Sequence, residues 1–244
     1  FGITHTFVDF TDLQAVRAAV TPETKLLYIE TPSNPMLGIT DIASIVNIAK
    51  EVGALTFLDN TFMTPIHQRP LDLGVDVVIH SATKFLSGHS DIVAGLVVTK
   101  DPTLSEQVYF IQNSFGSCLG VQDSFTLIQN MKTTAVRFNE SARVASVLAT
   151  FLDNHPLVEK VYYPGLASHP GADIHARQST SAGAVLSFSL PSYDVAKVFV
   201  EAMQIPVFAV SLGGVESILS YPAKMSHAAM EPEERAKRGI TDGL

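Results

Sequence analysis

The side chains best suited to chemistry lie where two short apolar stretches end. Asp59 closes the stretch 55–58, and Lys84 follows the stretch 75–81 after one tight turn. Both stretches have the length and the β-branched or aromatic content of buried strands. In an open α/β sheet the ligand lies beyond the carboxyl ends of the strands. A fixed carboxylate and a fixed amine would therefore face the same crevice.

The turn before Lys84 adds two hydroxyl groups, those of Ser81 and Thr83. An amine, a carboxylate and hydroxyls suited to a phosphate are the groups that pyridoxal phosphate requires. Its aldehyde takes a lysine as a Schiff base, its ring nitrogen takes an acid such as Asp59, and its phosphate takes the hydroxyls. A lysine at the exit of a buried strand is partly desolvated, which lowers the pKa of the amine and frees it as nucleophile and base. We therefore predict pyridoxal 5′-phosphate as the cofactor.

Each of these residues also has an ordinary structural explanation. A lysine is usually solvated, Asp59 could cap a helix or a loop, and Ser81 and Thr83 could simply form the turn. Asn34 follows a predicted strand, where an asparagine between Ser and Pro is most often a turn residue. Its functional alternative is a hydrogen bond to the cofactor ring or to the substrate.

Two other features carry less information. Ser211 begins a Ser-Leu-Gly-Gly segment whose backbone N–H groups could hold an anion. His67, His80 and His89 lack the spacing of metal ligands, so we expect no metal site.

The elements that must position these residues follow from periodicity and capping. The predicted strands are short apolar runs at 3–8, 26–30, 55–59, 75–81, 94–98, 158–162 and 184–190. The predicted helices show helical spacing or capping residues and cover 12–20, 41–52, 102–113, 123–154 and 193–203. The strand–helix–strand order over residues 26–59 favours a parallel sheet with a right-handed crossover.

The domain organisation is predicted from the helix at 123–154, which contains neither Pro nor Gly and could bridge two domains. We place the boundary near residue 145. Residues 1–145 would form a cofactor-binding large domain with a mostly parallel sheet, and residues 146–244 an α+β C-terminal domain. The sequence begins inside a predicted strand and stops without a tail. We therefore expect the N-terminal part of the first domain and the end of the second to be absent.

The composition argues against several classes of protein. The 244 residues, 46% of them apolar, suffice for one large or two modest domains. A net charge of −8 argues against a nucleic-acid partner. No run approaches the length of about 18 apolar residues that a membrane span needs. The single cysteine, Cys118, cannot form an internal disulfide and fits a reducing cytoplasm.

Four segments resemble those of one known family. They read LYIETPSNP at 27–35, LDNTF at 58–62, SATKFLSGHSD at 81–91 and SLGGVES at 211–217. They are similar to the pyridoxal-phosphate enzymes of cysteine and methionine metabolism, the trans-sulfuration family, over essentially the whole chain. Within that family, the segments VYYPGLASHPGA, FAVSLGGVESILSYPAKMSHAAM and EERAKRGITDGL are most similar to the Bacillus-type cystathionine β-lyases.

The resemblance implies a role for individual residues. Lys84 matches the lysine that forms the Schiff base and carries protons, and Asp59 matches the partner of the ring nitrogen. Ser81 and Thr83 match the hydroxyls that bind the phosphate.

The resemblance also implies the surroundings of the site. Asn34 and Ser211 match residues near the substrate carboxylate and the cofactor ring. The family has the aspartate-aminotransferase fold, fold type I, and its members are usually homotetramers built of tight dimers. Members also carry a ring-stacking tyrosine and a Ser-Gly-Met phosphate loop upstream, a Tyr and an Arg from the neighbouring subunit, and a carboxylate-binding arginine downstream. This sequence has none of these groups, so we do not expect the chain alone to complete the site.

The implied reaction is the cleavage of a carbon–sulfur bond. A cystathionine β-lyase releases homocysteine, pyruvate and ammonia as a step in methionine biosynthesis. Cystathionine γ-lyase, cystathionine γ-synthase and methionine γ-lyase stay open, because Lys84 could also remove the β-proton that γ chemistry needs. Val210 stands where synthases and γ-lyases often carry Glu, which favours the β-lyase over the synthase. Asn130, in QNMKTT at 129–134, replaces an arginine of the family pattern.

Two other classes of protein are alternatives to this enzyme. A non-catalytic member, which carries the cofactor or has a structural role, would show the same segments without turnover. A nucleotide-binding α/β domain is disfavoured because no glycine-rich loop follows an early strand.

Overall fold

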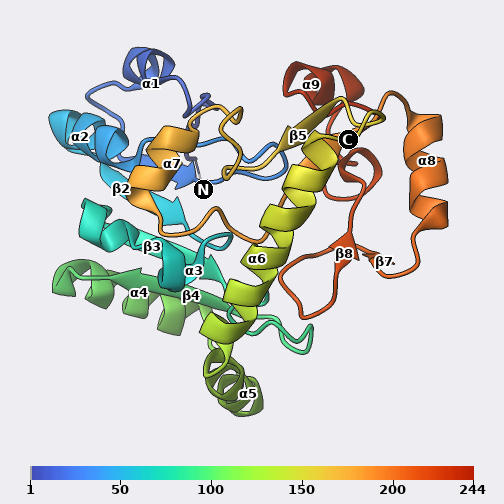
Figure 1. Ribbon diagram of the computed structural model, residues 1–244. Helices are drawn as coiled ribbons and strands as arrows, with labels where there is room; N and C mark the ends of the chain where they lie inside the picture. Colours follow the sequence, from blue (N-terminus) through green and yellow to red (C-terminus); the bar gives the residue numbers. More distant parts are fainter. Residues whose placement is uncertain (1) are drawn as a thin grey trace.

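The computed structural model describes residues 2–244 (Figure 1), and Phe1, the first residue of the predicted large domain, lies outside them. The strands are β1 Leu26–Glu30, β2 Leu55–Asp59, β3 Val77–Ser81, β4 Gly95–Thr99, β5 Lys160–Tyr162, β6 Ser187–Ser189, β7 Val207–Phe208 and β8 Ile218–Leu219. The helices are α1 Leu13–Ala19, α2 Ile42–Val52, α3 Thr64–His67, α4 Pro102–Phe115, α5 Val121–Met131, α6 Thr134–Asp153, α7 Ala172–Gln178, α8 Tyr193–Ala202 and α9 Pro232–Lys237. Short 3-10 helices cover Pro70–Leu73 and Pro222–Lys224.

One sheet of four strands forms the first half of the fold. Its order is β1-β2-β3-β4, in which β1, β2 and β3 run parallel and β4 runs antiparallel to β3. The register pairs Glu30 with Asp59, and Asp59 with Ile79. Because the three parallel strands end at the same edge, the residues that follow them lie close together. This topology confirms the predicted, mostly parallel sheet.

Helix α2 connects β1 to β2 and covers one face of the sheet. The Asp41 side chain accepts a hydrogen bond from the Ser44 N–H at 3.0 Å at its start, and Gly53 ends it with a φ of 69°. Glycine adopts this conformation without steric cost. The helix and the sheet share one buried cluster, which includes Ile42, Ile45, Ile48, Leu27, Ile29 and Leu58. Full burial of each such side chain stabilises the fold by about 1.5–3 kcal/mol.

Helix α6 runs between the sheet and the C-terminal elements (Figure 1). Near its start, Phe138 packs edge-on against Phe85, with the two ring centroids 4.9 Å apart. Farther along the helix, Ala145 and Ala149 belong to the same buried cluster as Tyr163. One helix therefore packs against the segment that carries Lys84 and against the second half of the chain. The domain boundary near residue 145 stays a prediction.

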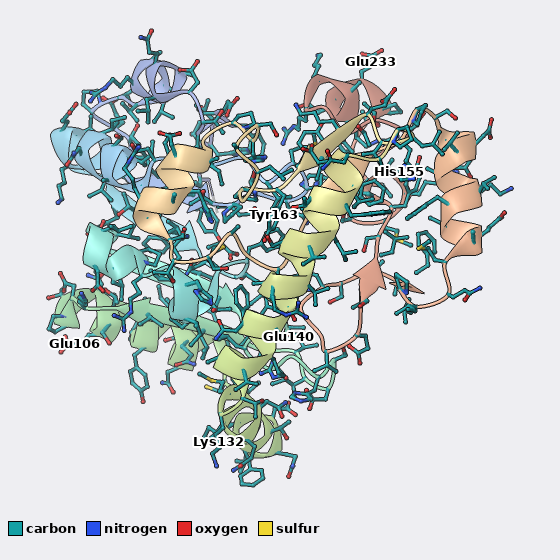
Figure 2. All side chains as sticks on the ribbon, viewed as in Figure 1. Glu106, Lys132, Glu140, His155, Tyr163 and Glu233 are labelled. Atoms are coloured by element: carbon teal, nitrogen blue, oxygen red, sulfur yellow. The ribbon has the colours of Figure 1, made fainter. Side chains whose placement is uncertain are left out.

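Tyr163 lies at the centre of this second cluster. Its side chain is buried, and its hydroxyl donates to the Gly183 carbonyl at 3.0 Å. Burial raises the pKa of Tyr163 to about 12, so the phenol stays protonated. Figure 2 shows Tyr163 in the interior, whereas Glu106 and Lys132 lie at the periphery.

Residues 3–8 do not form the predicted strand. Within the described part of the chain no strand pairs with them, and the side chains of Ile3 and Phe7 are 80% and 79% exposed. A strand without a partner leaves its backbone N–H and C=O groups to water. The apolar pattern of this segment was therefore not sufficient to make a strand.

The helix predicted at 123–154 is also wrong, because it is divided into α5 and α6. The chain leaves the helical conformation at Thr133, where φ is −108° and ψ is 2°. The Thr133 hydroxyl and Arg137 Nη2 donate to the Asn130 carbonyl at 3.1 and 3.0 Å. These side chains compete for a carbonyl that would otherwise accept the next helical bond.

The short elements of the second half were predicted least well. Strands β5 and β6 pair antiparallel over only three residues each, fewer than predicted. The sequence interpretation missed α3, α7 and α9, which have four, seven and six residues. Helices of this length carry too little periodicity to be recognised. No helix within residues 2–244 is both long and apolar enough to cross a membrane.

Candidate active site

A cavity of about 400 Å³ lies between the carboxyl ends of the parallel strands and the C-terminal elements. Its lining includes five of the six predicted site residues, namely Asn34, Asp59, Ser81, Lys84 and Ser211. The sixth, Thr83, does not line it. Apolar side chains complete the wall, among them Val185, Phe188, Phe199 and Leu212. A carboxylate, an amine and two hydroxyls thus meet in a partly apolar cavity of ligand size.

Lys84 is held at the cavity by a segment 127 residues away in sequence. Its Nζ donates to Ser211 Oγ at 2.7 Å. Burial lowers the pKa of Lys84, so a larger fraction of the amine is neutral at a given pH than for an exposed lysine. A neutral amine is the form that acts as nucleophile or base.

The backbone around Ser211 is shaped to approach Lys84 closely. Ser211 itself has a φ of 83°, a left-handed conformation that costs a residue with a side chain about 1–3 kcal/mol. Gly213 has a φ of 81°, and a Cβ there would lie 2.7 Å from the Phe85 nitrogen and 3.0 Å from the Lys84 carbonyl carbon. Only glycine leaves room for this contact, so the Ser-Leu-Gly-Gly segment serves here as a backbone support of the lysine turn.

Asp59 reaches the cavity from the end of β2. Its Oδ1 accepts the Thr61 N–H at 2.9 Å, which fixes the orientation of the carboxylate. Its register neighbour on β1 is Glu30, which also lines the cavity and accepts the Asn34 N–H at 3.0 Å. Desolvation raises the pKa of Glu30. The hydrogen bond from the Asn34 N–H lowers this pKa, whereas the negative charge of Asp59 raises it further.

Glu30 is a cavity residue that the sequence interpretation missed. The signal was present, because Glu30 ends an apolar strand in the same way as Asp59 does. Parallel neighbours in register place both carboxylates on the same face of the sheet.

Asn34 sits in the loop 31–38, which residues far along the chain hold in place. Ser187 Oγ donates to the Pro35 carbonyl at 2.6 Å, and His169 Nε2 lies 2.8 Å from the Leu37 carbonyl. His169 is buried, and desolvation lowers its pKa, which favours the neutral ring. The second half of the chain therefore fixes the loop that presents Asn34.

Ser81 and Thr83 face different surroundings. Ser81 lines the cavity, and its backbone N–H donates to Thr61 Oγ1 at 2.8 Å. The Thr83 hydroxyl bonds to Ala94 twice, accepting its N–H at 2.9 Å and donating to its carbonyl at 3.2 Å. Thr83 lines a neighbouring hollow of about 600 Å³ instead. Of the two residues predicted to bind the phosphate, only Ser81 lines the cavity.

Asn130, which departs from the family pattern, still binds the loop beyond Lys84. Its amide donates to Ser87 Oγ at 2.9 Å and to Asp91 Oδ2 at 3.0 Å. The hydrogen bonds from Asn130 and Ser87 lower the pKa of Asp91. The neutral amide of Asn130, which replaces the arginine of the family pattern, thus contacts the carboxylate of Asp91.

The groups in the cavity fit pyridoxal phosphate. The amine of Lys84 is partly desolvated, Asp59 offers a carboxylate with a fixed orientation, and Ser81 offers a hydroxyl. These are the three functions that the aldehyde, ring nitrogen and phosphate of that cofactor require.

The whole chain, residues 1–244, matches the profile of a family described as Cys/Met metabolism PLP-dependent enzyme. It is 63% identical over 244 residues to cystathionine beta-lyase MetC of Bacillus subtilis (strain 168), covering 100% of this chain and 63% of that protein. It is 47% identical over 243 residues to cystathionine gamma-lyase of the same strain, covering 100% of this chain and 64% of that protein. The chain therefore spans a little under two thirds of the length of these relatives.

Solved structures give the same result for the fold. The crystal structure of cystathionine gamma-lyase from Lactobacillus plantarum complexed with L-serine matches with a TM-score of 0.96 and 46% identity. The match covers 100% of this chain and 64% of that one. Together with the mostly parallel sheet, this confirms the predicted α/β fold of the aspartate-aminotransferase type.

Proposed function

The chain belongs to the Cys/Met metabolism PLP-dependent enzymes, and from this membership we propose that it acts as a carbon–sulfur lyase, a cystathionine β-lyase. Its reaction would convert cystathionine and water to homocysteine, pyruvate and ammonia. The observation that carries the proposal is the meeting of Lys84 and Asp59 in one cavity. The higher identity to a β-lyase, 63%, than to a γ-lyase, 47%, supports the choice of reaction.

The residues would divide the work as follows. Lys84 would attach the cofactor, and Asp59 would keep its ring nitrogen protonated. Ser81 would donate to the phosphate, and Thr83 could join it only by giving up its bond to the Ala94 carbonyl. When bound, pyridoxal phosphate supplies an electron sink for the pair left at the substrate α carbon.

Lys84 would also move the protons of the reaction. As a free amine it would take the proton from the α carbon of cystathionine, which its lowered pKa favours. The carbon–sulfur bond at the β carbon then breaks, and its electron pair leaves with the sulfur. The ammonium of Lys84 can give its proton to that sulfur. Ser211 Oγ, which accepts from Nζ at 2.7 Å, would hold the amine in place for both transfers.

Two residues would bind or select the substrate. Asn34 would bind near the substrate carboxylate and the cofactor ring, in a loop that is fixed from both halves of the chain. Val210 lines the cavity and brings no carboxylate there. An apolar side chain at this position supports the β-lyase over cystathionine γ-synthase.

Product analysis tests the reaction. Incubation of the full-length protein with cystathionine is expected to release pyruvate and homocysteine in equal amounts. A γ-lyase would release 2-oxobutyrate and cysteine instead, so those products would overturn the β-lyase and keep the family chemistry. No product of either kind, from a protein whose visible absorbance shows bound cofactor, would support the non-catalytic alternative.

We also propose that the protein is a homo-oligomer, a dimer of dimers, in the cytoplasm. Every residue of α4 is exposed or half-buried, including the aromatic residues Tyr109, Phe110 and Phe115. Exposed apolar side chains continue on α5 at Phe125 and Ile128. An apolar surface of this kind is typical of a contact with another chain. The free, exposed thiol of Cys118 fits a reducing compartment.

Sedimentation of the full-length protein tests the assembly. We expect the wild-type protein to have the mass of four chains. Phe110→Asp should have a lower mass, because it would bury an uncompensated charge in the interface and so weaken the assembly. Val198→Asp changes a similarly exposed apolar residue on α8 and should leave the mass unchanged. A wild-type monomer would contradict the proposal.

A further inference from the structure

Arg137, in the first turn of α6, directs its guanidinium at the turn that follows Lys84. Its Nη1 donates to the Phe85 carbonyl at 2.9 Å, and its Nη2 donates to the Leu86 carbonyl at 3.2 Å. The same Nη2 donates to the Asn130 carbonyl at 3.0 Å. One planar group therefore binds two successive carbonyls directly after the lysine, a geometry that lysine could not reproduce.

The charge of Arg137 is not used in an ion pair. Within residues 2–244, no carboxylate oxygen lies within 4.0 Å of its guanidinium. Arg143 on the same helix differs, because it is exposed and paired with Glu140 at 2.7 Å. Burial lowers the pKa of Arg137, a sign that the group has given up water for backbone carbonyls.

Two irregular features of the backbone make room for this side chain. Gly88 has a φ of 74°, and a Cβ there would collide with Nη1 of Arg137. The break between α5 and α6 places Thr133 Oγ1 3.0 Å from Arg137 Nε, where it accepts a hydrogen bond. The left-handed conformation of Gly88 and the helix break at Thr133 thus both allow the Arg137 guanidinium to reach the lysine turn.

The lysine turn is consequently held by two separate contacts. Arg137 binds the carbonyls of Phe85 and Leu86, and Gly213 packs against the Phe85 nitrogen. The side chain of Lys84 extends from this turn to Ser211. Arg137 binds Phe85, the residue next to Lys84, so a shift of the turn would also displace the Lys84 amine.

We propose that Arg137 is a positioning residue, which fixes the turn after Lys84 and so the place of the Lys84 amine in the cavity. The proposal rests on the proposed role of Lys84 and adds a residue outside the cavity to it. Arg137 does not line the cavity, so it would act on the reaction only through the turn.

The test compares three variants of the full-length protein. Arg137→Met removes the guanidinium but keeps an unbranched side chain, Arg137→Lys keeps the charge without the planar fork, and Arg143→Met is the control on the same helix. The readouts are kcat and KM for cystathionine, and amide hydrogen exchange of residues 84–91 in the cofactor-free protein. The exchange measurement does not depend on activity.

Arg137→Met is expected to lower kcat by about 10–100-fold with KM nearly unchanged, because a displaced reacting group costs rate rather than binding. Exchange at residues 84–91 should rise by about tenfold or more while β1 and β2 keep their protection. Arg137→Lys should lie between Arg137→Met and wild type, and Arg143→Met should equal wild type.

Wild-type kcat and exchange in a folded Arg137→Met protein would overturn the proposal. A fall in kcat without faster exchange at residues 84–91 would overturn it too, since the effect would then bypass the turn. If Arg137→Met does not fold, Arg137→Lys is the deciding variant. Wild-type kcat and wild-type exchange at residues 84–91 in that variant would contradict the role of the planar guanidinium. A wild-type protein that lacks both cofactor absorbance and lyase activity would refute the proposed function, while the exchange data would still measure the hold of Arg137 on the turn.

Discussion

Replacement of Lys84 by alanine is expected to abolish the cleavage of cystathionine, with a fall in kcat of roughly 10⁴-fold or more. The amine is the only group in the proposed mechanism that both attaches the cofactor and moves protons. The variant removes both functions and also the partner of Ser211 Oγ at 2.7 Å. Pyruvate release from the full-length protein at saturating cofactor measures the effect.

Because burial lowers the pKa of Lys84, wild-type activity should persist below the pH at which exposed lysines lose their proton. Lys50→Ala is the matched control, since Lys50 is exposed in the last turn of α2. It should leave turnover unchanged. Turnover of the Lys84→Ala protein within about tenfold of wild type would remove Lys84 from the proposed mechanism, because losing an essential nucleophile costs far more.

Asp59→Asn is expected to lower kcat by about 100-fold or more, the scale of losing one preorganised electrostatic partner. The amide has the shape of the carboxylate, and its oxygen can keep the bond from the Thr61 N–H at 2.9 Å. What it loses is the negative charge that would keep the cofactor ring nitrogen protonated. The fold should therefore survive while the rate and the visible absorbance of the bound cofactor change.

Asp41→Asn makes the same chemical change outside the cavity. Asp41 caps α2, and asparagine caps a helix about as well as aspartate. This control should retain wild-type kcat and absorbance. If Asp59→Asn behaved like the control, Asp59 would be a loop acid that merely orders the Thr61 turn.

The sequence by itself determined the elements that carry the central pair of residues. Leu55–Asp59 and Val77–Ser81 are short, apolar and bounded by turns, and such runs form buried strands wherever a sheet can take them up. Asp41 and Gly53 marked the ends of α2 because caps act within one helical turn. The parallel order then placed Asp59 and Lys84 at one edge, since right-handed crossovers leave few other arrangements.

Where the side chains point was decided by tertiary structure. Ser81 and Thr83 are two residues apart, yet Thr83 turns to the Ala94 backbone, because β4 lies antiparallel beside β3. The sequence could not indicate which of the two residues would line the cavity. That choice depends on which backbone groups a neighbouring strand leaves unpaired.

The supports of Lys84 were likewise decided by contacts between distant segments. Arg137 lies 52 residues from Phe85, and Ser211 lies 127 residues from Lys84. The same contacts interrupt the helix predicted at 123–154, since Arg137 and the Thr133 hydroxyl both bind the Asn130 carbonyl. Local propensity favours an unbroken helix there, but the half-buried guanidinium of Arg137 and the Thr133 hydroxyl take the Asn130 carbonyl as a hydrogen-bond acceptor instead.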